Sequence, residues 1–117
     1  MKLRLDVGLV RGRHDMPVEG YIFDEIENPL DFDALDKRVS EWISSHIDIG
    51  SYYGSGINQV DYADVEVLCG DKHLYVYVTG LTSATAAVIG CCARNGIALT
   101  LMHFDKDTGT YLPQRIF

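Results

Sequence analysis

The feature that most constrains this chain is a pair of apolar segments on either side of a segment rich in small residues. Residues 73–78 are apolar and aromatic enough for a central strand, and residues 97–104 read as a second buried strand. Between them, residues 82–96 begin with hydroxyl side chains and end in Asn-Gly, as helices often do. A strand, a helix and a strand in this order form a right-handed β-α-β unit with parallel strands. The sequence therefore predicts an α/β fold.

Further strands extend this unit to a mixed sheet of about five strands. Alternating polar and apolar residues predict strands at residues 2–7 and 62–68, and the second is expected to form a hairpin with residues 73–78. Residues 110–117 form the last predicted strand, which Pro113 restricts to the edge of the sheet. If the first strand is parallel to the others, the polar turns that follow the strands meet at one edge.

Two or three helices are expected in total. Residues 18–26 have apolar side chains at helical spacing, although Gly20 weakens that prediction. A stronger helix follows with Asp31 as its N-cap and with Leu30 and Leu35 at the positions of a hydrophobic staple. Its predicted apolar stripe consists of Phe32, Leu35, Val39, Trp42, Ile43 and Ile47.

Length and composition point to a single domain over residues 1–117. The chain has 117 residues, of which 47% are hydrophobic, and its longest apolar runs are far below the roughly 20 residues that cross a bilayer. The N-terminus lacks an apolar signal-peptide region, so we expect a cytoplasmic protein. The three cysteines form no pattern typical of a disulfide framework, and we expect buried thiols.

The net charge of −7 disfavours binding to duplex nucleic acid, which depends on basic residues that replace phosphate counterions. The charge is unevenly distributed, because basic residues gather before residue 14 and acidic ones between residues 15 and 41. A small basic region on an acidic protein suggests a local site for a compact anion. A solvated acidic surface that keeps the protein soluble explains the charge equally well.

Two predicted turns supply the groups for such an anion site. The turn after residue 78 leads into a helix, whose free amides and dipole attract anions, and Gly80 allows the backbone to approach a ligand closely. Arginines in the turn after the first strand add charge-assisted hydrogen bonds. Ordinary helix capping and a solvated turn are the alternative explanations. The candidate anion-binding residues are Arg11, Arg13, Thr79, Gly80, Thr82 and Ser83.

Candidate catalytic and base-binding residues lie near this edge or in a loop. His14 and His103 stand at polar boundaries, and histidine titrates near neutral pH, so either is a candidate general acid or base. Tyr52, Tyr53 and Asn58 belong to a Gly- and Ser-rich loop in which aromatic and amide groups are able to stack on and read a nucleobase. Surface histidines without a catalytic role and a protein-contact loop are the alternatives. Neither a metal site nor a cofactor is expected, because no histidine or cysteine pair has metal-ligand spacing.

Residues 72–104 resemble small Rossmann-like proteins of the CARF and ring-nuclease type. An apolar strand at 74–78, the sequence Thr79-Gly80-Leu81-Thr82 entering a small-residue helix, and a second strand that ends in His103 carry the resemblance. Proteins of this type bind cyclic oligonucleotide signals of prokaryotic immunity. The resemblance implies a homodimeric nucleotide sponge, or a metal-independent phosphodiesterase of the ring-nuclease kind, carried by a phage or mobile element for immune evasion.

The sequence is compatible with two functions from different classes. The first is binding of a phosphate-bearing small ligand, with or without cleavage. The second is an acidic interaction module or inhibitor that acts through its negative face. That face would consist of Asp15, Glu19, Asp24, Glu25, Glu27, Asp31, Asp33 and Asp36.

Overall fold

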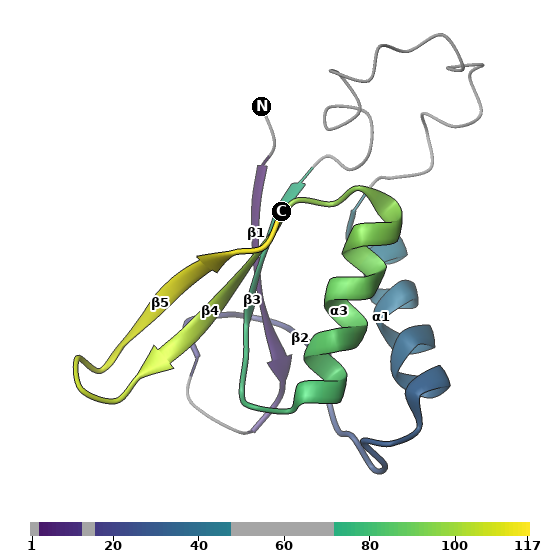
Figure 1. The fold of residues 1–117 in the computed structure, drawn as a ribbon, viewed down its shortest axis with the longest axis horizontal. Coiled ribbons are helices and arrows are strands. Elements are labelled where there is room, and N and C mark those ends of the chain that lie inside the picture. The colour runs from purple at the N-terminus through teal and green to yellow at the C-terminus, as the bar shows by residue number, and fades with distance from the viewer. Residues whose placement is uncertain (1–2, 13–15, 48–71) are drawn as a thin grey trace, which may run out of the picture.

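The computed structural model describes residues 3–12, 16–47 and 72–117. Within them, a five-stranded sheet packs against two helices, so the predicted α/β fold with a mixed sheet is confirmed. Both helices lie on the same side of the sheet (Figure 1). The elements are β1 (Leu3–Val10), β2 (Tyr21–Phe23), α1 (Phe32–His46), β3 (Lys72–Tyr77), α3 (Thr82–Asn95), β4 (Leu99–Asp105) and β5 (Thr110–Arg115).

The strands of the sheet run in the order β2-β1-β3-β4-β5. β1 is parallel to both β2 and β3, and β3 is parallel to β4, whereas β5 is antiparallel to β4. The predicted β-α-β unit is therefore present as β3, α3 and β4. The predicted edge strand is β5, with Pro113 opposite Met102. The predicted strand at residues 62–68 lies outside the described residues, and β3 pairs with β1 and β4.

This strand order explains why the two helices share one face. The chain moves from β2 past β1 to β3 and then on to β4, always in the same direction across the sheet. Right-handed crossovers in one direction place both helices on the same side. The connection from β1 to β2 runs in the opposite direction. Within this connection, the sulfur of Met16 lies 3.0 Å from the position that a Cβ on Gly8 would take.

The predicted helix after Asp31 is confirmed as α1. The Asp31 carboxylate accepts a hydrogen bond from the Ala34 amide at 3.2 Å and so caps the helix. Four residues of the predicted stripe, Leu35, Val39, Trp42 and Ile43, are buried within the helix, and Ile47 is buried just after it. Two other predictions are wrong. Leu30 is 72% exposed and Phe32 is 58% exposed, so Leu30 forms no staple and Phe32 lies outside the stripe.

The short helix predicted at residues 18–26 is also wrong, because the chain forms strand β2 there. Tyr21 lies beside Gly8 of β1, and its ring occupies the space above that glycine. Tyr-Ile-Phe favours a strand, and Gly20 disfavours a helix. Pairing with β1 therefore outweighs the helical spacing of the apolar residues.

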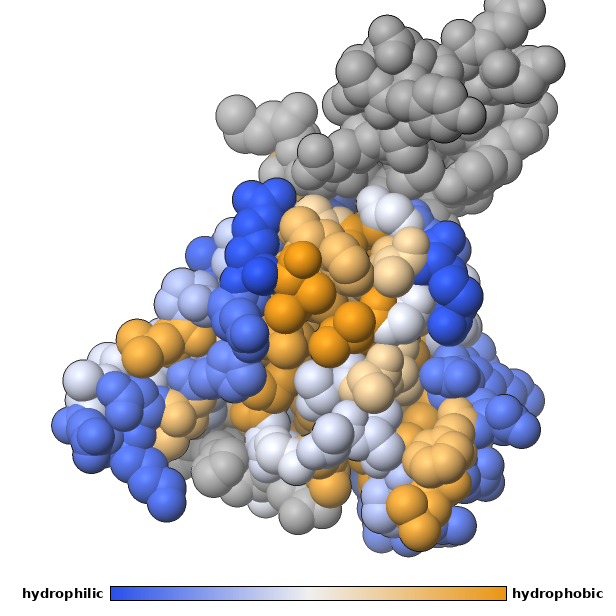
Figure 2. Space-filling view, viewed as in Figure 1, coloured by the Kyte–Doolittle hydropathy of each residue, from blue (hydrophilic) through white to orange (hydrophobic). Residues whose placement is uncertain are grey.

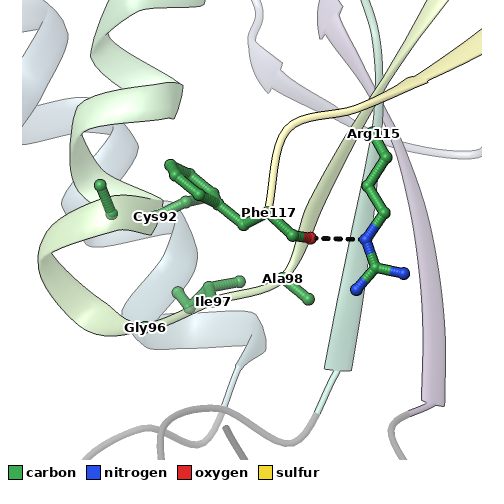
Figure 3. Close-up of a pocket in the computed structure, with 7 residues that line it drawn as sticks. Cys92, Gly96, Ile97, Ala98, Arg115 and Phe117 are labelled. Carbon is green, nitrogen blue, oxygen red and sulfur yellow. Dashed lines mark hydrogen bonds between the residues drawn. The ribbon is translucent and has the colours of Figure 1, made fainter.

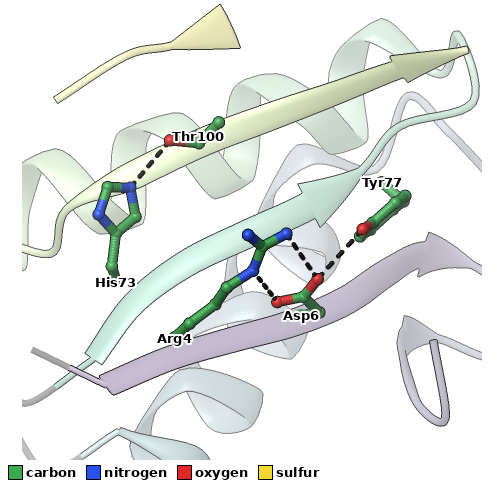
Figure 4. Close-up of polar contacts among 5 residues, drawn as sticks. All are labelled: Arg4, Asp6, His73, Tyr77 and Thr100. Atoms are coloured by element: carbon green, nitrogen blue, oxygen red, sulfur yellow. Dashed lines mark hydrogen bonds and ion pairs between the residues drawn. The ribbon is translucent and has the colours of Figure 1, made fainter. Parts of the chain in front are cut away.

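The sheet face opposite the helices carries a polar and aromatic network (Figure 4). Arg4 donates two hydrogen bonds to Asp6, at 2.7 and 3.0 Å, and the Tyr77 hydroxyl donates to the same carboxylate at 3.1 Å. The Arg4 guanidinium also stacks on the Tyr75 ring, 3.9 Å from its centroid. Burial raises the pKa of Tyr77, and the Asp6 carboxylate raises it further. The opposite charges of Arg4 and Asp6 are therefore paired with each other on this face of the sheet.

Candidate functional site

The carboxyl ends of β1 and β3 form the topological switch point of the sheet. After β1 the chain turns toward β2, and after β3 it turns the other way toward β4. Open α/β sheets bind ligands in the crevice outside such a point. The register pairs Gly8 with Tyr77, so the turns that contain Arg11 and Gly80 both follow the carboxyl ends of these neighbouring parallel strands. The structure thus brings two of the predicted turns to one edge.

The start of α3 contributes unpaired donors to this edge. The helix begins at Thr82, and its N-cap residue, Leu81, has no side-chain oxygen and makes no capping hydrogen bond. The first turn also contains no acidic residue, in contrast to α1, which has Asp31 as cap and Asp33 in its first turn. The interpretation of Thr82 as a capping residue is therefore wrong. The N-terminus of α3 keeps its positive partial charge without compensation from a carboxylate of its own first turn.

Gly80 and Thr79 shape the backbone before the helix. Gly80 has φ +90°, which favours glycine, and no atom lies within 4 Å of the position that a Cβ would take. The Oγ1 of Thr79 is buried and has no hydrogen-bond partner within the described part of the chain. A buried hydroxyl without a partner costs about 1–3 kcal/mol. Thr79 therefore carries an unsatisfied buried hydroxyl next to Gly80.

Arg11 reaches the same edge but is already engaged. Its Nε lies 2.9 Å from an oxygen of Asp24, and its guanidinium stacks on the Tyr21 ring at 4.9 Å from the centroid. Both members of the ion pair are exposed, with 58% of the Arg11 side chain and 75% of the Asp24 side chain accessible. Such exposed pairs contribute about 0–1 kcal/mol and exchange readily. An incoming phosphate would compete with Asp24 for Arg11.

The sequence alone did not indicate Tyr21 and Asp24 as neighbours of Arg11. Both lie in the segment predicted as a helix, and the parallel pairing of β1 with β2 brings them beside Arg11. The Tyr-Ile-Phe triplet after a glycine was the available signal for a strand at this position.

Of the other candidate residues, one lies on β4 and the rest lie outside the described residues. His103 is within β4 rather than after it, it is exposed, and its Nε2 lies 2.7 Å from Gln114 Oε1 on β5. The structure thus places His103 against β5. Five candidates lie outside the described residues, namely Arg13, His14, Tyr52, Tyr53 and Asn58.

A separate cavity of about 380 Å³ lies at the opposite end of α3 (Figure 3). It is bounded by the last turn of the helix and by the segment after β5, where the ring of Phe117 points toward the helix. Cys92 on its wall is fully buried, and burial raises the pKa of this thiol to about 12. The thiol is therefore protonated and inert at neutral pH. The lining residues are Cys92, Ala93, Gly96, Ile97, Ala98, Arg115 and Phe117.

Over residues 3–12, 16–47 and 72–117, no three His, Cys, Asp or Glu side chains come together as a metal site. In the same residues, neither helix combines the length and the apolar character needed to span a bilayer.

Comparison with known proteins finds no matching protein family, no matching curated protein and no matching solved structure.

Proposed function

We propose that this protein binds a phosphate-bearing small ligand at the switch point between β1 and β3. The start of α3 carries the proposal, because its first turn lacks a side-chain cap and an acidic residue and follows the carboxyl end of β3, at the edge where open α/β sheets bind ligands. The conformation of Gly80 and the buried hydroxyl of Thr79 support it. The phosphate would accept hydrogen bonds from the amides of Thr82 and Ser83.

In this proposal Arg11 leaves Asp24 and contacts the phosphate. A guanidinium binds phosphate with two parallel hydrogen bonds, which are stronger than neutral ones. The ligand would be a nucleotide, and a cyclic oligonucleotide is the form that resemblance to CARF and ring-nuclease proteins implies. A homodimer in the cytoplasm that sequesters such a signal, or cleaves it with His14 or His103 as acid or base, is the corresponding role.

Charge substitutions at the helix start test the site. Thr82 is exposed, so we expect both Thr82→Glu and Thr82→Gln to fold. A carboxylate in the first turn stabilises the helix by about 0.3–1 kcal/mol but repels a bound anion. Isothermal titration with ATP, a cyclic oligoadenylate and inorganic phosphate should therefore show weaker binding for Thr82→Glu than for Thr82→Gln. Equal affinity in both variants would contradict the proposal.

A substitution of Asp24 tests the same site, but here the affinity for phosphate is expected to increase. Asp24→Asn removes the competing carboxylate, so phosphate binding should become tighter by up to about fivefold, the equivalent of one exposed ion pair. Arg11→Gln should weaken binding. An unchanged affinity in Asp24→Asn, together with a normal melting temperature, would show that Arg11 takes no part.

A further inference from the structure

The turn before α1 presents apolar side chains to solvent in a fixed conformation. The Asn28 side chain accepts a hydrogen bond from the Leu30 amide at 3.0 Å, and the Asn28 carbonyl accepts one from the Asp31 amide at 3.2 Å. Pro29 restricts the backbone between them. Leu30 is thereby held 72% exposed, and Phe32 next to it is 58% exposed. We name Leu30 and Phe32 the apolar tip.

A hollow next to the apolar tip has apolar walls. It has a volume of about 270 Å³, and Phe23, Ile26 and Leu35 contribute carbon surface to it. Carboxylates line the same hollow, whereas its one basic residue, Arg38, donates from Nε to the Ile22 carbonyl at 2.6 Å. Figure 2 shows apolar surface over the start of α1, bounded by hydrophilic side chains. The lining residues are Phe23, Glu25, Ile26, Glu27, Asn28, Asp31, Ala34, Leu35 and Arg38.

The sequence that leads into α1 is strongly acidic. Residues 16–36 contain seven acidic residues and no Lys, Arg or His. Within the described part of the chain, only Asp24 of these seven is in an ion pair. The acidic residues are Glu19, Asp24, Glu25, Glu27, Asp31, Asp33 and Asp36. Glu25, Glu27 and Asp31 line the hollow beside the tip, so this surface favours a partner that combines apolar and basic side chains.

We propose that the apolar tip and the adjoining hollow dock a basic segment of a partner protein. Apolar side chains of this segment would cover Leu30 and Phe32, and its Lys or Arg residues would face Glu25 and Glu27. The fixed turn lowers the entropic cost of docking, because Leu30 is already held in its exposed position. This interaction surface is separate from the proposed phosphate site.

A titration with a synthetic amphipathic peptide of Leu and Lys tests this docking surface in the full chain. Amide NMR signals of Glu25, Glu27, Leu30 and Phe32 should shift most. The double substitution Leu30→Ser with Phe32→Ser should weaken binding at least about tenfold, as expected when anchor residues are removed. Leu3→Ser is the matched control, because Leu3 is 66% exposed and belongs to β1, and it should leave the affinity unchanged.

The other outcomes overturn the proposal. Equal affinity of wild type and the double variant, with melting temperatures showing that both are folded, would mean that only charge attracts the peptide. If a peptide of Ser and Lys binds as tightly as the peptide of Leu and Lys, charge alone again explains the binding. Shifts at these residues that depend on protein concentration without peptide would assign the surface to a second copy of the chain. No binding of the Leu and Lys peptide at low ionic strength would also reject it.

Discussion

Gly8 lies where the side chains of Tyr21 and Met16 pack closely against β1. A Cβ built on Gly8 would lie 2.4 Å from Cδ1 of Tyr21 and 3.0 Å from the sulfur of Met16. The Tyr21 ring is stacked under the Arg11 guanidinium, so moving it disturbs a second contact. This position therefore requires glycine for space, and its φ is not the reason.

We predict that Gly8→Ala lowers the free energy of unfolding by about 1–3 kcal/mol, the usual cost of overpacking. Gly20→Ala is the control, since no atom lies within 4 Å of its Cβ position, and it should change the free energy by less than about 0.5 kcal/mol. Urea denaturation of both variants measures these values. Equal losses in the two variants would contradict the explanation.

Because the Cys92 thiol is buried, we predict that the free energy of unfolding changes with pH in the alkaline range. Its pKa is about 12 in the folded protein and 9.0 without the surrounding structure. Below pH 9 the Cys92 thiol is therefore neutral in both the folded and the unfolded protein. Above pH 9 the thiol loses its proton in the unfolded chain first, which favours unfolding. Stability should fall by up to about 1.4 kcal/mol per pH unit between pH 9 and 11 from this group.

Cys92→Ala should make this decline shallower, although its stability at pH 7 will be lower because a cavity forms. Urea denaturation between pH 7 and 11 gives the slopes. The pKa of Tyr77 is also raised by burial, so the free energy of unfolding of Cys92→Ala should still fall somewhat above about pH 10. An identical slope in Cys92→Ala would show that the thiol does not titrate as described.

At the scale of elements, local signals predicted the helices and most strands. Asp31 and the periodic stripe identified α1, and Gly96 in the left-handed conformation ends α3 as the Asn-Gly pair indicated. β2 was missed because three residues are too few for a clear alternation, and its pairing with β1 is a long-range contact. The exposure of Leu30 was missed because a staple requires the tertiary position of the chain before the helix.

Pro113 protects the free edge of the sheet. The Ile116 amide donates a hydrogen bond to the Leu99 carbonyl, so these two residues form a hydrogen-bonded pair of the antiparallel ladder. Hydrogen-bonded and non-hydrogen-bonded pairs alternate along such a ladder, which makes Met102 and Pro113 a non-hydrogen-bonded pair. The backbone nitrogen of Pro113 therefore points away from β4. A proline there removes an outward donor and hinders pairing with another chain.

Pro113→Val should therefore increase self-association. Sedimentation velocity over a range of protein concentrations compares the variant with wild type. An unchanged distribution of species would indicate that other features, such as the exposed charged side chains in the turn between β4 and β5, protect this edge.

At the scale of the whole molecule, the topology joins the separate parts of the candidate site. The sequence predicted that turns after parallel strands meet at one edge, and β1 and β3 are indeed parallel neighbours whose carboxyl ends precede the turns with Arg11 and Gly80. The ion pair of Arg11 with Asp24 was not predictable, because it depends on where β2 is placed in the sheet. The proposed competition between Asp24 and a ligand for Arg11 rests on this ion pair.

A small ligand and a basic partner protein would also differ in what the protein retains from cells. Native mass spectrometry of the purified protein separates the two, because a nucleotide adds a few hundred daltons and a protein partner adds thousands.

Amide NMR with a cyclic oligoadenylate tests the phosphate site most directly. The account predicts that the signals of Gly80, Thr82 and Ser83 shift on titration, together with the Nε signal of Arg11, and that Thr82→Glu reduces these shifts at equal ligand concentration. If the ligand binds but the largest shifts lie around the cavity at Cys92 and Phe117, or if no signal at the start of α3 moves at saturating nucleotide, the phosphate site is not there.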